Sequence, residues 1–176
     1  TYASGTAKIV PTVSGTAGNV ITVRAVNEGA VLIDGQQARR PIDLNTNYIT
    51  VIGINFKSGS DTTCVVCGNN NTLQRFLCWD DADGGSDNSN VIDVGGGGNN
   101  VFEDCGAWGI SRKTLASGAR GGVGPNTFRR CWIRLEGHNG NPSTPTHSVE
   151  AGYDQENVTM ENMLITVDKF SNTITS

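Results

Sequence analysis

A short pattern of apolar residues recurs six times along the chain at uneven intervals, and this repeat constrains the fold more than any other feature. Residues 20–27 and 48–55 share Ile, Thr, Val and Asn at equivalent positions, and four further copies follow at 71–76, 100–105, 126–131 and 157–163. One column through the copies is apolar throughout and consists of Val23, Val51, Leu73, Phe102, Phe128 and Met160. A second apolar column, three residues later, consists of Val26, Ile54, Phe76, Cys105, Cys131 and Met163.

The uneven spacing of the copies indicates which kind of repeat protein this is. The steps along the first column are 28, 22, 29, 26 and 32 residues. A fixed local pattern with a variable step indicates strands in register, joined by loops of different length. Helical repeats would show a period of about 3.6 residues, and that period is absent. We therefore expect a solenoid of β-strands.

A second strand precedes several of the copies, after a turn rich in Asn or Gly. The predicted second strands are 42–44, 65–67, 92–94 and 149–151, and the turns include 45–47, 68–71 and 95–100. Strand, tight turn, strand and variable loop form the unit of a parallel β-helix, whose coils stack about 4.8 Å apart. The predicted fold is all-β, a right-handed parallel β-helix of about six coils. We expect a single domain over 1–176 that is part of a longer β-helix and lacks its terminal caps. We also expect inner apolar ladders and Asn ladders at the turns.

Composition limits the partners that such a solenoid would have. The chain has 23 Gly and a net charge of −4, with a pI near 5.1. This balance gives no general attraction to nucleic acid, and no apolar run approaches the roughly 20 residues that span a bilayer. Five cysteines leave at least one unpaired, and we expect Cys105 and Cys131 to be stacked free thiols, with a disulfide as the alternative.

The opening of the chain resembles a known group of proteins. Residues 14–25 read SGTAGNVITVRA and 31–35 read VLIDG, and copies of the form Asn-x-Phe-x-x-Cys follow. This pattern is similar to the β-helix repeat proteins of the pectate-lyase-like superfamily, closest to the branch with chondroitinase-B-like and alginate lyases. The resemblance implies the fold and an extracellular or cell-surface location. It implies no particular activity, because one scaffold carries many chemistries.

Acidic residues give the first candidate sites. Asp43, Asp93 and Glu150 are predicted to face outward as a row interrupted by Val66, which would bind Ca²⁺, act as an acid/base pair or simply face solvent. Asp81, Asp83 and Asp87 resemble a Ca²⁺-binding loop without its closing Glu, and a solvated acidic turn is the alternative. Calcium is thus the cofactor that the sequence suggests.

Basic residues give the second candidate site. Arg112, Lys113, Arg120, Arg130 and Arg134 fall within two successive copies and could form a cationic surface for an acidic glycan. A lyase needs a cation to neutralise the uronate carboxylate and a base to take the α-proton. The predicted catalytic residues are Lys113, His138 and Arg134, and Arg112, Arg120 and Arg130 would bind substrate. Charged outward positions without a site are the alternative.

Tryptophans complete the predicted glycan surface. Trp79, Trp108 and Trp132 follow Cys78, Cys105 and Cys131, and they would stack on sugar rings if exposed, with loop-side packing as the alternative. Of the three, Trp79 and Trp132 are predicted to bind substrate. Three functions remain open at this point: a secreted module that binds polysaccharide, a polysaccharide lyase or hydrolase, and a structural component of a fibre, adhesin or phage tail. The last would use self-association through uncapped ends, because exposed strand edges are normally covered.

Overall fold

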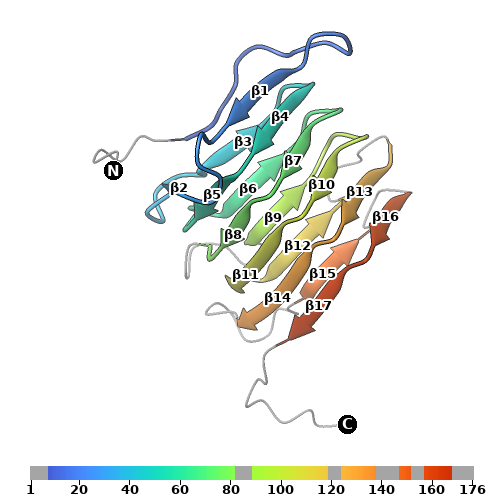
Figure 1. Cartoon of the computed structure of the whole chain (residues 1–176). Coiled ribbons are helices and arrows are strands. Elements are labelled where there is room, and N and C mark those ends of the chain that lie inside the picture. The colour runs from blue at the N-terminus through green and yellow to red at the C-terminus, as the bar shows by residue number, and fades with distance from the viewer. Residues whose placement is uncertain (1–7, 82–88, 119–123, 138–146, 152–156, 168–176) are drawn as a thin grey trace, which may run out of the picture.

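The computed structural model describes residues 8–81, 89–118, 124–137, 147–151 and 157–167 and shows a parallel β-helix (Figure 1). The chain visits three parallel sheets in turn and returns to the first sheet one coil further along. Sheet I contains β1 (Ile21–Arg24), β4 (Ile49–Ile52), β7 (Thr72–Gln74), β10 (Val101–Glu103), β13 (Asn126–Arg129) and β16 (Val158–Glu161). Sheet II contains β2 (Val31–Asp34), β5 (Ile54–Lys57), β8 (Leu77–Trp79), β11 (Gly106–Ile110), β14 (Trp132–Gly137) and β17 (Leu164–Val167). Sheet III contains β3 (Ile42–Leu44), β6 (Thr62–Val66), β9 (Asn90–Val94), β12 (Lys113–Ser117) and β15 (His147–Ala151).

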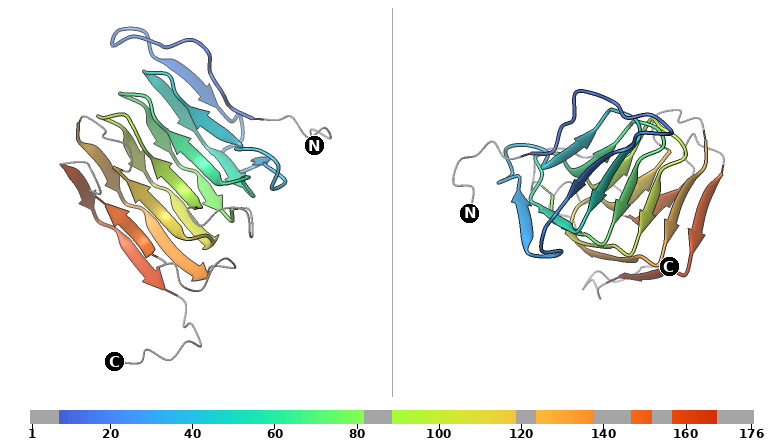
Figure 2. Two further views of the ribbon diagram at one scale, coloured as in Figure 1. Left: turned by 180° about the vertical axis from the view of Figure 1, so that it is seen from behind. Right: turned by 45° about the horizontal axis from the view of Figure 1, so that its top comes forward.

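The first apolar column is the inner ladder of sheet I, and its predicted register is confirmed. Val23 pairs with Val51, and each following member lies on the equivalent member of the next coil, ending with Met160 on Phe128. The rings of Phe102 and Phe128 stack with centroids 4.8 Å apart. Strands of successive coils lie side by side along the axis (Figure 2), so residues at equivalent positions are stacked on one another.

The second column is confirmed in five of its six members and wrong at Val26. Val31 pairs with Ile54, whereas Val26 is 98% exposed. The reason is an insertion: residues 25–30 separate β1 from β2, while a single residue separates β4 from β5, so residues 26–30 are extra. An alignment of 20–27 with 48–55 without a gap pairs Val26 with Ile54. In the structure Val31, five residues later, takes that position.

Sheet III also departs from the predicted strands. Ile42 pairs with Cys64, so the inner positions of β6 are Cys64 and Val66, and the predicted segment 65–67 was one residue late. The outward row is consequently interrupted by Val65 and not by Val66, and Ala116 of the unpredicted strand β12 interrupts it again. Asp43, Asp93 and Glu150 do lie in this row, with one uncharged residue between successive carboxylates.

Sheet II was not predicted as a separate sheet, because its strands follow those of sheet I after only one or two residues from the second coil onward, and the first of these residues makes the corner. That residue has a positive φ in every coil from the second to the sixth: Gly53, Arg75, Asp104, Arg130 and Asn162. Its N–H group still donates to the next coil, as from Arg75 to the Glu103 carbonyl at 3.0 Å. The chain therefore turns a corner without losing the ladder of backbone hydrogen bonds.

The inserted residues 26–30 include Glu28, which covers this corner. A Cβ at Gly53 would lie 2.5 Å from Cγ of Glu28, so only glycine fits beneath the inserted segment. The Glu28 carboxylate then reaches Arg75 in the third coil, with Oε2 2.5 Å from Nε. The insertion is held by an ion pair that crosses a whole coil.

An asparagine ladder closes the turns between sheets III and I, as predicted. Asn71, Asn100 and Asn126 are each 0% exposed. The Asn100 Oδ1 accepts from the Asn71 N–H at 2.9 Å, and the Asn126 Oδ1 accepts from the Asn100 N–H at 3.1 Å. The Nδ2 groups donate outward along the turn, as from Asn100 to the Gly68 carbonyl at 2.9 Å. Each side chain thus satisfies buried backbone groups that no strand pairs.

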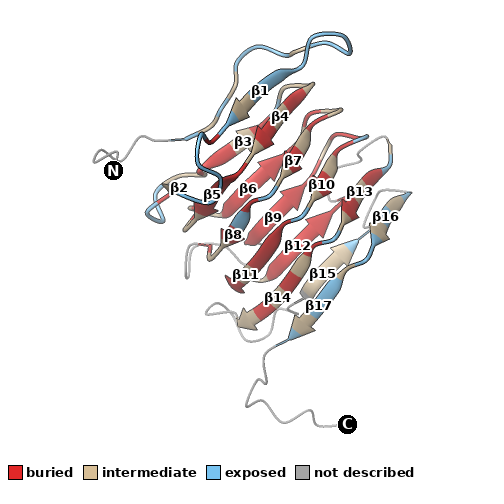
Figure 3. Ribbon diagram, viewed as in Figure 1, coloured by how far each residue is buried: buried red, intermediate tan, exposed pale blue. Residues whose placement is uncertain are grey.

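The core runs the length of the solenoid and thins at both ends. The largest fully buried side chains are Phe56, Phe76, Phe102, Phe128, Ile42, Leu44, Ile49, Leu73, Ile92, Leu115, Ile133 and Val51. Figure 3 shows buried residues through the central coils and exposed ones on β1, β2 and β17. Among the described residues there is no helix long and apolar enough to cross a membrane.

Candidate functional site

Lys113, the predicted base, lies at the start of β12 and is nearly enclosed. It is 4% exposed, and its Nζ lies 3.0 Å from Oε1 of Glu150. This ion pair joins the predicted base to one member of the carboxylate row. Arg134 lies on the outer face of sheet II, where its guanidinium is 2.7 Å from Oε1 of Glu136. His138 and Arg120 lie outside the described residues.

The structure places the predicted basic residues on different parts of the solenoid. Arg112 and Lys113 belong to the start of a sheet III strand, Arg134 to sheet II, and Arg130 to the corner between sheets I and II. They do not converge on one point among the described residues. Their predicted roles in binding and catalysis stay predictions.

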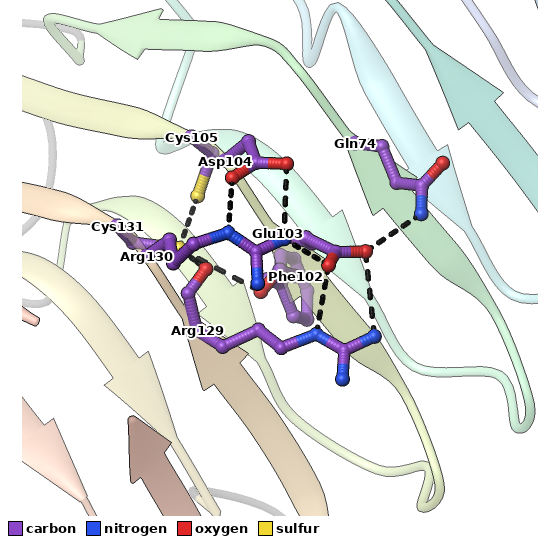
Figure 4. A network of polar contacts seen from close by, with 8 residues as sticks. All are labelled: Gln74, Phe102, Glu103, Asp104, Cys105, Arg129, Arg130 and Cys131. Atoms are coloured by element: carbon purple, nitrogen blue, oxygen red, sulfur yellow. Dashed lines mark hydrogen bonds and ion pairs between the residues drawn. The ribbon is translucent and has the colours of Figure 1, made fainter. Parts of the chain in front are cut away.

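Arg130 takes part in the densest network of charges on the surface (Figure 4). Its guanidinium bonds both Asp104, with Nε 2.6 Å from Oδ1, and Glu103. Arg129 and Gln74 also bind Glu103, at 3.0 Å and 2.8 Å. Hydrogen bonding by Arg130, followed by that of Arg129, holds the pKa of Glu103 below its ordinary value of 4.5. Opposite charges stacked on successive coils make this corner a stabilising ladder.

Asp81, the first of the three predicted calcium ligands, follows β8. It is 2% exposed, and its N–H group donates to the Ile110 carbonyl at 3.1 Å. Asp83 and Asp87 lie outside the described residues. Within the described ranges, no three His, Cys, Asp or Glu side chains come together as a metal site. The calcium site stays a prediction.

Trp79 and Trp132 meet a third tryptophan, Trp108, on the outer face of sheet II. Trp79 and Trp108 are register partners, and their rings stack 5.1 Å apart at an interplanar angle of 3°. Trp108 and Trp132 stack at 5.7 Å and 29°. Trp132 pairs in register with Gly106 and leans over it, since a Cβ there would lie 3.6 Å from the Trp132 ring. The absent side chain of Gly106 lets the third ring join the stack.

The tryptophan stack is half-exposed and is flanked by further groups of the same face. Lys57 precedes Trp79 in the column, and Arg134 follows Trp108. Leu77 and Leu164, in the neighbouring column, are 42% and 59% exposed. The indole N–H groups form no hydrogen bond within the described part of the chain. The three tryptophans and these flanking residues therefore form one surface along the outer face of sheet II.

Cys105 and Cys131 are free thiols at the same corner, in agreement with the prediction. Both are buried, and their Sγ atoms lie 2.9 Å apart. Hydrogen bonding to Cys131 and then burial raise the pKa of Cys105. The pair packs against the Phe102 and Phe128 ladder, because the Cys131 thiol lies 3.6 Å from the Phe102 carbonyl. These thiols belong to the interior of the corner.

Sequence reasoning missed a pocket beside sheet III. It has a volume of about 310 Å³ and is lined by Lys8, Val10, Arg39, Arg40, Asp43, Ser60 and Asp61. These residues come from the segment before β1, the turn between β2 and β3, the start of β3 and the turn between β5 and β6. The turns vary between coils, so the repeat carries no signal for them. The feature of the sequence that could have indicated the pocket is the pair of adjacent arginines, Arg39 and Arg40, between β2 and β3.

The fold and these surfaces define the class of protein: a three-sheeted parallel β-helix solenoid with a tryptophan stack on one outer face and a charged pocket at one corner. Comparisons of the chain with protein-family models, with curated proteins and with solved structures find no match.

Proposed function

We propose that this chain is a polysaccharide-binding β-helix module and that the glycan lies along the outer face of sheet II, parallel to the solenoid axis. The observation that carries this proposal is the stack of Trp79, Trp108 and Trp132. Three indole N–H donors without a partner among the described residues follow one another along a half-exposed face. A donor that repeats along an axis suits a polymer whose acceptor oxygens also repeat.

The spacing of the stack supports a polymeric ligand. The ring centroids are 5.1 Å and 5.7 Å apart, which is close to the length of one pyranose residue in an extended glycan. The ring faces lie against one another, so sugar residues would contact the indole edges and N–H groups and would not stack on the faces. Leu77 offers apolar contact for sugar C–H groups, and Arg134 offers a charged donor at the far side.

The sequence resemblance supports the same ligand class. Membership of the pectate-lyase-like superfamily and an extracellular or cell-surface location belong to this proposal. We do not extend it to cleavage of the glycan, because Lys113 is buried against Glu150 and Arg134 pairs with Glu136 on a different sheet. Binding alone needs only the outer face of sheet II.

The test replaces all three tryptophans with phenylalanine, which keeps aromatic rings in the stack and removes the indole donors. Each lost hydrogen bond weakens binding by about 0.5–1.5 kcal/mol. We expect retardation of the protein in gels containing alginate, pectate or chondroitin, and at least tenfold weaker binding by the triple variant. The matched control, Thr50→Val with Thr127→Val, removes hydroxyl groups from sheet I and should bind like the original chain. Equal binding by the triple variant would refute the proposal.

A second candidate function, end-to-end assembly, is favoured by the outermost strands. Leu32 on β2 and Leu164 on β17 belong to the same outward column and are 46% and 59% exposed. A second copy stacked on the first would place these leucines together and would bring Glu161 next to Arg24, which share a column of sheet I. Sedimentation velocity should then show a concentration-dependent oligomer that Leu164→Lys abolishes. A monomer at all concentrations would contradict assembly.

A further inference from the structure

The pocket beside sheet III contains an arginine that is fixed by two carboxylates. Arg40 donates from Nε to Asp61 Oδ1 at 2.8 Å and from Nη2 to Oδ2 at 2.5 Å. Its Nη1 also lies 3.5 Å from Asp43 Oδ2. Two parallel hydrogen bonds of this kind fix the Arg40 guanidinium, and the Asp61 carboxylate compensates its positive charge. Hydrogen bonding by Arg40 keeps the pKa of Asp61 below its ordinary value of 3.8, so the pair stays charged at neutral pH.

Two other cations of the pocket are not compensated in this way. Lys8 and Arg39 line the same cavity, and neither forms an ion pair with any described residue. The lining therefore carries three positive and two negative side chains in a chain whose net charge is −4. The excess positive charge lies at the side of the cavity formed by Lys8 and Arg39, so a ligand with one anionic group would be attracted there.

The remaining groups of the pocket suit the hydroxyl groups of a sugar. Asp43 and Asp61 offer carboxylate oxygens that accept hydrogen bonds, and the Ser60 hydroxyl both donates and accepts. A volume of about 310 Å³ is at the lower end of the range for small-molecule pockets, roughly 300–1,000 Å³, and suits one monosaccharide unit. A simple inorganic anion would leave most of this cavity and its acceptors unused.

We infer that this pocket binds one uronic acid residue of an acidic glycan, with the sugar carboxylate between Arg39 and Lys8 and its hydroxyl groups facing Asp43, Asp61 and Ser60. The inference rests on the proposed polysaccharide binding and specifies its acidic subsite. The pocket lies at the corner that leads from sheet II to sheet III, where its residues Ser60, Asp61, Arg39 and Arg40 follow Lys57 or Asp34 by three to six positions. Those two residues continue the tryptophan column toward the first coil, so a chain on sheet II would extend toward the pocket.

The test uses the free monosaccharide, so that the pocket is measured separately from the tryptophan stack. We expect saturation-transfer NMR to show binding of sodium glucuronate or galacturonate, weakened by added salt, and no binding of glucose. Arg39→Gln with Lys8→Gln should weaken uronate binding at least tenfold. Arg24→Gln, which removes an exposed guanidinium on sheet I, is the matched control and should leave binding unchanged.

The outcomes separate this inference from the proposed function. Unchanged uronate binding by the double variant, or binding of inorganic phosphate as tight as that of uronate, would overturn the inference. Retention of alginate by a chain that binds no free uronate would also overturn it, while the role of the tryptophan face would stand. Loss of polymer binding in the triple tryptophan variant, with uronate binding intact, would support both sites.

Discussion

Replacing Asn100, in the middle of the asparagine ladder, with alanine should destabilise the solenoid. The buried side chain serves two backbone groups of neighbouring coils: it accepts from the Asn71 N–H at 2.9 Å and donates to the Gly68 carbonyl at 2.9 Å. Alanine leaves both groups buried without a partner, and each such group costs about 1–3 kcal/mol. The expected loss is therefore about 2–6 kcal/mol in the free energy of unfolding.

Urea unfolding followed by circular dichroism measures this loss through the transition midpoint. Asn45→Ala is the matched control, because Asn45 is exposed and bonds only the Asp43 side chain, and we expect a change within about 0.5 kcal/mol. Asn47→Ala should fall between the two, since Asn47 Oδ1 accepts from the N–H of Asn69 at a half-buried turn. An Asn100 variant as stable as the Asn45 variant would show that the ladder does not hold the turns together.

Three further predictions concern backbone contacts, charge and thiols. Gly97→Ala should lower the unfolding free energy by at least about 2 kcal/mol in urea, because a Cβ there would overlap the Gly68 carbonyl oxygen, whereas at the adjacent Gly96 the nearest atom is 3.6 Å away and alanine should be tolerated. Stability should fall as the pH drops below 4.5, because the pKa of Glu103 is lowered in the folded chain, so its contribution is complete above the unfolded value and is lost as the pH falls through the folded one. Glu103→Gln should flatten this acid limb of the urea midpoint, Glu161→Gln should not, and an unchanged slope in the first variant would contradict the assignment. Thiol titration at pH 8 should label at most Cys67 in the folded chain, since the thiols of Cys64, Cys78, Cys105 and Cys131 are buried; rapid labelling in a Cys67→Ser variant would contradict this burial.

The apolar ladders and the asparagine ladder could be predicted because each coil imposes the same local requirement. A buried position in register must be apolar, and a buried turn must satisfy the same backbone groups, so the columns of Phe102 and Asn100 are visible in the sequence. Sheet II could not be distinguished from sheet I in the sequence, because a residue with positive φ makes the corner between them. Residues as different as Gly53 and Arg75 occupy that position, so no residue type marks the corner. The N–H group of the corner residue keeps a hydrogen bond to the next coil whether that residue is Gly53 or Arg75, so the backbone ladder continues in either case.

The surface was less predictable than the core. The sequence indicates Trp79 and Trp132 as candidate glycan-binding residues but not their contact, which runs through Trp108 and depends on the missing side chain of Gly106. The basic residues of two adjacent copies were expected together, yet the corners of the solenoid direct Lys113, Arg130 and Arg134 to different sides. The charged pocket depends on turns of unequal length, whose three-dimensional proximity no repeat alignment expresses.

The insertion at residues 26–30 shows how one coil of this solenoid accommodates a longer corner. Glu28 lies on Gly53, and its carboxylate binds Arg75 one coil beyond. The residue beneath the insertion has no side chain, and a residue of the following coil supplies the opposite charge. Val31 still pairs with Ile54, so the extra residues lie outside the ladder of strands. A coil of this scaffold can therefore carry additional surface residues while its strands keep their partners.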